Sequence, residues 1–235
     1  LPDFCDRYFL SGYNESGSTD AFLTDPFVSA NRVKMDLFQK YGVLAAAGDR
    51  HLAEFMDINL YLKTKSVVQK WKFALTTVNQ RIDKRNFRIK ETRELAAGEK
   101  PIVLRKSNEE AIALIRAILG KTCLVSNVNL VNHGQMPGLP VGSIVETNAV
   151  FMNDNVVPLL SGRLPDPVLE MVRLHSDNLE LLYQGIRKRD WIPIFRAFMN
   201  QPLCSGLSQA EGRELFIEMA HRTGHYLEKD YSLSQ

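Results

Sequence analysis

The spacing of apolar residues changes twice along this chain, and this limits the folds that it can adopt. From about residue 27 to residue 119 apolar residues recur at helical intervals, from 122 to 157 they follow the pattern of strands, and from 167 the helical intervals return. We therefore expect an α+β fold, in which helices surround a small and mostly antiparallel sheet. The expected helices cover 27–41, a short stretch after Gly48, 66–97, 107–119, 167–186, 189–200 and 208–228, and the expected strands cover 122–130, 143–151 and 156–157.

The first 26 residues are polar and irregular, so we expect a loop over 1–26 and a single domain over 27–235. The chain of 235 residues is 45% hydrophobic, which supplies apolar mass for one large or two small cores. It contains neither a Gly-x-Gly-x-x-Gly turn nor a Walker loop. We therefore expect no nucleotide-binding Rossmann domain in this chain, and because it starts at Leu1 instead of Met, we expect a piece of a longer protein.

Charge and cysteine content argue against several classes of partner. The 29 basic and 27 acidic residues leave a net charge of +2, which gives no general reason to expect nucleic acid or an anionic membrane. No apolar run approaches the roughly 18 residues that a transmembrane helix needs, and no charged-then-apolar leader is visible. The cysteines, Cys5, Cys123 and Cys204, are far apart in sequence, so we expect free thiols and a cytoplasmic location.

Residues 45–55 hold the densest group of reactive side chains. An apolar run of mostly small residues, 43–47, leads into Asp49, Arg50 and His51. A carboxylate beside a guanidinium and an imidazole is a usable acid or base with a physical reason for a shifted pKa. The alternative is that the triplet begins a surface helix, with the aspartate as its N-cap.

The expected helix over 66–97 carries a run of basic residues. They are Lys84, Arg85, Arg88 and Lys90, and they alternate in sequence with Asp83, Glu91 and Glu94. Because mixed charges of this kind are typical of a solvated helix face, we interpret the run as exposed surface and do not expect nucleic acid as a partner.

Two groups of motifs carry information beyond composition. The first group is Asn31-Arg32-Val33-Lys34, Tyr41-Gly42 and Ala47-Gly48-Asp49-Arg50-His51-Leu52-Ala53-Glu54-Phe55. The second group is Asn129-Leu130-Val131-Asn132-His133-Gly134-Gln135-Met136-Pro137-Gly138-Leu139-Pro140, Val145-Glu146 and Gly162-Arg163-Leu164-Pro165. In this order they resemble the C-terminal region of the family-4 glycoside hydrolases, closest to the α-glucosidase and α-galacturonidase members. The resemblance covers nearly the whole chain from about residue 27.

The resemblance implies a two-domain enzyme with the plan of lactate and malate dehydrogenases. A Rossmann domain would bind NAD, and this chain resembles only the C-terminal domain, which serves substrate binding and oligomerisation. The implied reaction is glycoside hydrolysis by redox-assisted elimination, with oxidation at the sugar C3 and proton abstraction at C2. A divalent metal such as manganese polarises the sugar oxygens. The family's metal-binding Cys and His lie upstream, and Cys5 is followed by Asp6, so we assign neither metal ligands nor cofactor-binding residues to this chain.

The same resemblance suggests catalytic roles. Asp49 suits the base that removes the C2 proton, and Tyr41 is the alternative base. Arg50 or His51 suits the place where enolate charge develops. An arginine also matches a uronate carboxylate through its bidentate fork.

Three further residues are candidates for substrate binding. They are Glu54, Asn132 and His133, the last two in a turn that leaves a predicted strand. Each has a structural alternative. Glu54 would cap a helix, Asn132 would adopt a left-handed turn conformation, and His133 would be an exposed side chain.

The implied substrate is a small glycoside or uronide, and the implied assembly is a homodimer or homotetramer. We expect this fragment alone to be inactive, because it lacks the glycine-rich turn and the metal ligands. A function of a different class stays open from sequence, namely a non-catalytic helical domain for oligomerisation or interaction. The sequence sets neither the sugar, nor its anomer, nor whether it is phosphorylated.

Overall fold

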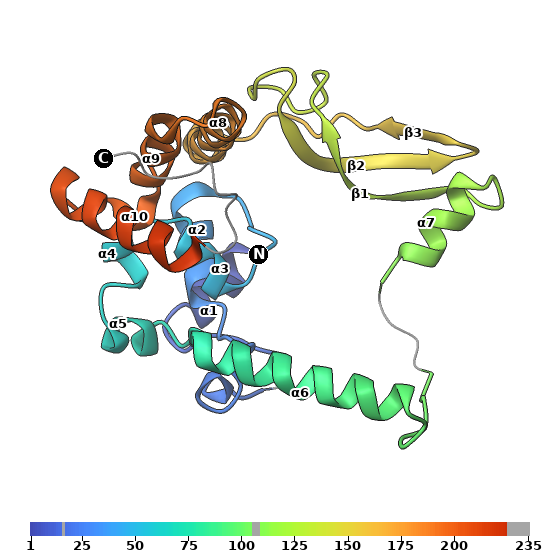
Figure 1. Cartoon of the computed structure of the whole chain (residues 1–235), viewed down its shortest axis with the longest axis horizontal. Coiled ribbons are helices and arrows are strands. Elements are labelled where there is room, and N and C mark those ends of the chain that lie inside the picture. Colours follow the sequence, from blue (N-terminus) through green and yellow to red (C-terminus); the bar gives the residue numbers. More distant parts are fainter. Residues whose placement is uncertain (16, 105–108, 225–235) are drawn as a thin grey trace.

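The computed structural model describes residues 1–15, 17–104 and 109–224. It shows helices around one small antiparallel sheet, which confirms the expected α+β class. A helical body gathers α1 (Pro2–Tyr8), α2 (Arg32–Tyr41), α3 (Asp49–Glu54), α4 (Ile58–Tyr61), α5 (Lys65–Lys70), α8 (Asp166–Lys188), α9 (Trp191–Met199) and α10 (Gln209–Thr223), with short 3₁₀ turns at Ala21–Leu23 and Pro202–Cys204. Helix α6 (Val78–Ala96) and the sheet extend away from this body, and α7 (Ala111–Ile118) lies beside the sheet (Figure 1).

The sheet has the order β1-β2-β3 and consists of β1 (Leu124–Val131), β2 (Ile144–Met152) and β3 (Asn155–Pro158). Both pairings are antiparallel, with Leu124 opposite Phe151 and Ala149 opposite Pro158. The β2–β3 turn is tight because Asn153 and Asp154 both adopt left-handed conformations, with φ of 42° and 61°. The three strands that the periodicity predicts are therefore confirmed.

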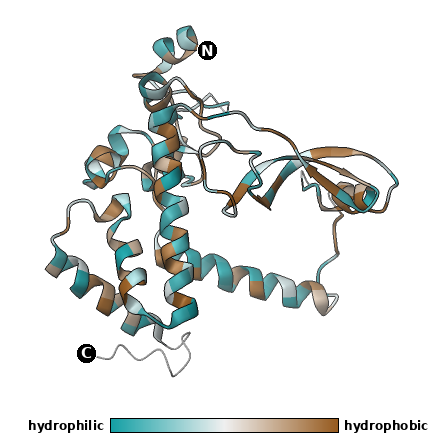
Figure 2. Cartoon of the chain, turned by 90° about the horizontal axis from the view of Figure 1, so that it is seen from above, coloured by the Kyte–Doolittle hydropathy of each residue, from teal (hydrophilic) through white to brown (hydrophobic). Residues whose placement is uncertain are grey.

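The core consists of three separate clusters. The first joins α2 to α3, α4 and α5, the second packs α7 on the sheet, and the third packs the β1–β2 loop on α8. Their buried members are Val33, Leu37, Leu52, Ala53, Tyr61, Val68 and Phe73 in the first, Ala117, Ala149 and Phe151 in the second, and Leu139, Val145 and Leu169 in the third. Because each cluster is small, many large apolar side chains stay exposed. Figure 2 shows that apolar residues occur along the sheet as well as in the helical body.

The single long helix expected over 66–97 is wrong. The chain forms α5 and α6 instead, because Lys72 takes a left-handed conformation with φ of 55° and ends the first helical segment. Thr77 then starts α6 with a capping box, in which its side chain accepts from the Gln80 N–H and the Gln80 side chain accepts from the Thr77 N–H.

Two other expected boundaries need correction. Residues 2–8 form α1, so the expected loop over 1–26 is wrong there; Arg32 fixes this segment by donating to the Phe9 carbonyl at 2.9 Å and to the Lys70 carbonyl. The helix expected from residue 27 begins at Arg32, after Asn31 in a left-handed conformation. The expected start at Ser107 and Asn108, and the expected end at 225–228, lie outside the described residues, while the division into 1–26 and 27–235 stays a prediction.

Among the described helices, none combines the length and the hydropathy that crossing a bilayer requires.

Two glycines of the β1–β2 loop give a matched test of how this loop packs on α8. Gly138 and Gly142 both have positive φ, of 96° and 95°. A Cβ at Gly138 would lie 2.6 Å from Cδ2 of Leu169, whereas a Cβ at Gly142 would meet no heavy atom within 4 Å. Both alanine variants strain the backbone, but only Gly138→Ala overpacks the third cluster. We expect it to lower the free energy of unfolding by about 1–2 kcal/mol more than Gly142→Ala, measured by urea denaturation; equal losses would contradict this packing.

Candidate functional site

Helix α3 has a buried side and a more exposed side. Successive residues of a helix are turned by about 100°, so Asp49, Leu52 and Ala53 face inward and are buried. Arg50 and His51 face the other way, Arg50 partly buried and His51 exposed. The candidate triplet is therefore divided between the protein interior and the surface.

The carboxylate of Asp49 lies at the N-terminus of α2. Its side chain is 0% exposed, and Oδ1 accepts from the Lys34 N–H at 3.0 Å. Asn31, the residue at the N-cap of α2, makes no side-chain capping bond, so Asp49 supplies from another helix the acceptor that this end lacks. Its Oδ2 has no hydrogen-bond partner among the described residues.

Burial raises the pKa of Asp49 to about 6, although the backbone N–H groups of Lys34, Val33 and Arg32 and the charge of Lys34 oppose the rise. A carboxyl with a pKa near 6 has the acidity of a general base for neutral pH. Its complete burial, however, makes the structural role the better supported one, and the role of Asp49 as base stays a prediction.

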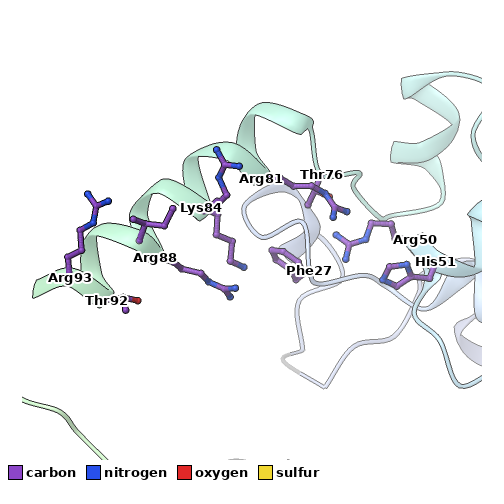
Figure 3. Close-up of a pocket in the computed structure, with 11 residues that line it drawn as sticks. Phe27, Arg50, His51, Thr76, Arg81, Lys84, Arg88, Thr92 and Arg93 are labelled. Carbon is purple, nitrogen blue, oxygen red and sulfur yellow. The ribbon is translucent and has the colours of Figure 1, made fainter. Parts of the chain in front are cut away.

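Arg50 and His51 open onto a groove of about 770 Å³ between α3 and α6. We call it the basic groove, and its lining residues are Phe27, Arg50, His51, Thr76, Arg81, Lys84, Arg85, Arg88, Ile89, Thr92 and Arg93. Figure 3 shows Arg50 and His51 on one side of Phe27 and the helix that carries Lys84 and Arg88 on the other. None of the described residues that line it is acidic, so the groove is suited to an anion.

The exposed helix face expected for residues 83–94 is confirmed, because residues 83–93 are all exposed, but the side of α6 that lines the groove carries cations and no acid. At about 100° per residue, Arg81, Lys84, Arg85 and Arg88 gather on one side, whereas Lys90 and Glu94 fall on the other and pair at 3.8 Å. The sequence interpretation names Lys84, Arg85 and Arg88 but does not place them in a groove, because the opposite wall, with Phe27 and Arg50, is distant in sequence.

Arg50 is held by two contacts at the edge of the groove. Its Nη1 donates to the Pro26 carbonyl at 3.3 Å, and its guanidinium carbon lies 4.9 Å from the ring centre of Phe27. His51 Nδ1 lies 3.5 Å from Oε2 of Glu54, an ion pair when the imidazole is protonated. Glu54 is exposed and is not among the lining residues, so it contacts the groove only through His51.

Asn132 and His133 lie in the β1–β2 loop and do not line the basic groove. Asn132 is 0% exposed, and its Nδ2 donates to the carbonyls of Met136, Leu139 and Pro140 at 3.1–3.2 Å. Its Oδ1 accepts from the N–H groups of Gly134 and Met136. The Asn132 amide is therefore occupied inside its own loop, which supports a structural role. His133 is exposed.

Tyr41, the alternative base, lines a different pocket. This apolar pocket of about 380 Å³ lies between the α2–α3 segment and α8, with Phe55 and His175 in its wall. Burial lowers the pKa of His175, and its Nε2 has no hydrogen-bond partner among the described residues. Tyr41 and Arg50 thus face pockets on different sides of α3.

The part of the chain that the structure describes shows no cluster of metal ligands. Across the described residues, no three His, Cys, Asp or Glu side chains lie close enough together to hold a metal ion. The sequence also lacks the glycine-rich turn that a dinucleotide needs.

The buried Asp49 carboxyl makes stability depend on pH. Its ordinary pKa of 3.8 is raised to about 6 in the folded chain, so between these values the folded state keeps a proton that the unfolded state has lost. Its contribution to stability is present below pH 4, falls by about 3 kcal/mol as the pH rises from 4 to 6, and is constant above.

Asp49→Asn keeps an acceptor for the Lys34 N–H and removes the titration. The variant should therefore gain about 3 kcal/mol relative to the wild type between pH 4 and pH 6, measured by urea unfolding followed by circular dichroism. Asp177→Asn, at an exposed position on α8, should give a curve parallel to the wild type. A parallel curve for Asp49→Asn would contradict the raised pKa.

Asn132→Asp tests the structural role of the loop amide. The substitution places a carboxylate oxygen against three carbonyl oxygens in a fully buried position. We expect a loss of about 3 kcal/mol or more in the free energy of unfolding, whereas His133→Ala should change it by less than about 0.5 kcal/mol. If Asn132→Asp folds as stably as the wild type, the loop does not depend on this amide.

Comparisons with known proteins agree with one another. Residues 8–204 match the family model described as the family 4 glycosyl hydrolase C-terminal domain. An α-galacturonidase from Thermoanaerobacter italicus is 42% identical over 224 residues, which cover 95% of this chain and 49% of that protein. A solved Bacillus subtilis structure, described as a candidate glucosidase, superposes with a TM-score of 0.85 at 38% identity and covers 93% of this chain and 49% of that one.

More distant solved structures share the fold. A 6-phospho-α-glucosidase from gut microorganisms, solved with NAD and glucose 6-phosphate, has a TM-score of 0.69 at 17% identity over 96% of this chain and 51% of its own. A 6-phospho-β-glucosidase from Thermotoga maritima, solved with manganese, NAD⁺ and glucose 6-phosphate, has a TM-score of 0.61 at 16% identity over 88% of this chain and 46% of its own. The chain spans about half the length of each of these relatives. Because the family model and a relative at 42% identity cover most of its length, the chain belongs to glycosyl hydrolase family 4 and corresponds to the C-terminal domain of that family.

Proposed function

We propose that this chain is the substrate-binding half of a family-4 glycosidase of the α-galacturonidase type, and that the basic groove binds the carboxylate of a uronide. The observation that carries the proposal is the charge of the groove. Its described lining residues include five arginines, one lysine and one histidine but no acid. A neutral glycoside would bring no charge to these cations, whereas a uronate supplies an anion that the arginine fork matches.

The other groups of the groove suit the remainder of a sugar. Thr76 and Thr92 offer hydroxyls to the sugar hydroxyls, and Phe27 offers an apolar ring face. A sugar phosphate is also an anion and is the competing ligand. The relative that shares 42% identity is named an α-galacturonidase, which favours the uronide.

The catalytic roles expected from sequence become proposals of different strength. We propose that Arg50 and His51 stabilise negative charge on the bound sugar, because both line the basic groove. Asp49 lies buried beneath them, and Tyr41 faces the apolar pocket. The identity of the base, the oxidation at C3 and the proton abstraction at C2 all stay predictions.

NAD and a divalent metal, expected to be manganese, would bind to the half of the enzyme that corresponds to the part of the relatives not covered by this chain. Structural neighbours were solved with them, and the described residues of this chain include no group of three metal-ligating side chains. The cofactors would supply the redox chemistry of the sugar. This chain's residues bind and orient the substrate, and the fragment alone is expected to be inactive.

Self-association as a homodimer or homotetramer also stays a proposal. It is supported by apolar side chains exposed on the sheet, such as Val125, Ile144 and Val157, and by α6, which has no buried residue in the structure. The cytoplasmic location stays a prediction.

Calorimetric titration of the purified chain tests the proposed ligand. We expect methyl α-galacturonide to bind with a Kd on the order of 1 mM, more weakly as salt is added, and methyl α-galactoside to bind at least about tenfold more weakly. Equal affinities for the two would contradict the uronide, and tighter binding of galactose 6-phosphate would assign the groove to phosphorylated sugars.

Two lysines on the same helix provide a matched pair for this titration. Lys84 lines the groove, whereas Lys90 pairs with Glu94 on the other side of α6. Lys84→Gln should weaken uronide binding by about threefold to tenfold and Lys90→Gln by less than about twofold. Equal effects of the two substitutions would show that the ligand does not sit in the groove.

A further inference from the structure

Phe27 is an exposed aromatic residue with two cations on its ring. Its side chain is 60% exposed. The guanidinium carbon of Arg50 lies 4.9 Å from the ring centre and Nζ of Lys84 lies 4.3 Å from it. Both distances lie within the roughly 6 Å over which the ring quadrupole attracts a cation. Figure 3 shows the ring between the two side chains.

The backbone of Phe27 is held in place by its own turn. The Phe27 N–H donates to Oδ1 of Asp25 at 2.9 Å, and the Val28 N–H donates to the Asp25 carbonyl at 3.1 Å. The carbonyl of Pro26 accepts from Arg50, so the turn that presents the ring also binds the guanidinium. The ring is therefore a fixed platform.

Helix α6 contacts this platform through Lys84. The hydrogen bonds and ion pairs of α6 that the structure describes stay within residues 76–100. Its cation–ring contact with a more distant segment, among the described residues, is Lys84 with Phe27. Lys84 is otherwise held by no hydrogen bond or ion pair that the structure shows. Through the ring centre, the two charges can lie at most about 9 Å apart, given distances of 4.9 Å and 4.3 Å. An anion beside the ring would lie within about a Debye length, roughly 8–10 Å, of both charges, so both would attract it.

We propose that Phe27 is a positioning residue for anion recognition: its ring holds Arg50 of α3 and Lys84 of α6 as a pair that binds one carboxylate of the ligand. The inference rests on the proposed function, because it assumes that the anion occupies the basic groove. Two cations near one another repel, and the ring offsets this repulsion in the absence of ligand. The carboxylate then meets a preorganised pair and does not have to assemble it.

The test compares three variants of the chain by calorimetry with methyl α-galacturonide. Phe27→Leu keeps an apolar side chain but removes the ring, and Phe27→Tyr keeps the ring. The control, Phe87→Leu, removes a ring of α6 that is 63% exposed and does not line the groove. We expect Phe27→Leu to weaken uronide binding by about threefold to tenfold. Phe27→Tyr should restore it, and Phe87→Leu should leave it unchanged.

A second measurement reports on the pair without any ligand. The ring current of Phe27 should shift the side-chain methylene resonances of Lys84 upfield, and Phe27→Leu should abolish this shift while the shift persists in Phe27→Tyr. If the wild type prefers the uronide to the galactoside but Phe27→Leu binds the uronide as tightly as the wild type, the inference is overturned and the proposed function stands. The same holds if Phe27→Leu loses the upfield shift of Lys84 without any change in uronide affinity. A wild type with no preference for the uronide overturns the proposed function itself, before any variant is compared.

Discussion

The arrangement of the candidate site depends on one buried interaction, the carboxylate of Asp49 at the N-terminus of α2. The first N–H groups of a helix have no partner within it and carry a partial positive charge. Asp49 accepts from one of them, so α3 is fixed against α2 with one side facing inward. Because Arg50 and His51 follow directly on the same short helix, this contact also fixes their direction, toward the basic groove.

The buried carboxylate shows how one residue type can serve two roles. In the sequence, an aspartate beside an arginine and a histidine has the composition of an acid–base site. In the structure, its neighbours in sequence point away from it, and its partners are backbone groups of residues 32–34. The raised pKa of Asp49 is therefore a consequence of burial at a helix end. A perturbed pKa marks a functional residue only when the group is also accessible to a ligand.

Basic residues on one side of α6 form the second wall of the groove. The helix has no buried residue, so apolar packing in the described structure does not decide its orientation. The side that carries Arg81, Lys84 and Arg88 faces Phe27 and α3. A groove lined by cations from two helices and a loop is suited to an anionic ligand.

The sequence by itself determined the α+β class, the three strands and most of the helices, because apolar periodicity and turn residues are local properties. The motifs by themselves also indicate the family. Tertiary structure alone decided which polar residues line a pocket. Asn132 is buried, and its amide donates to backbone carbonyls four to eight residues further along the chain. Asp49 is buried by a helix that ends eight residues before it, and the groove pairs Arg50 with Lys84 across 34 positions of sequence. Whether a side chain is buried depends on contacts between segments that are distant in sequence, so the local sequence pattern cannot predict it.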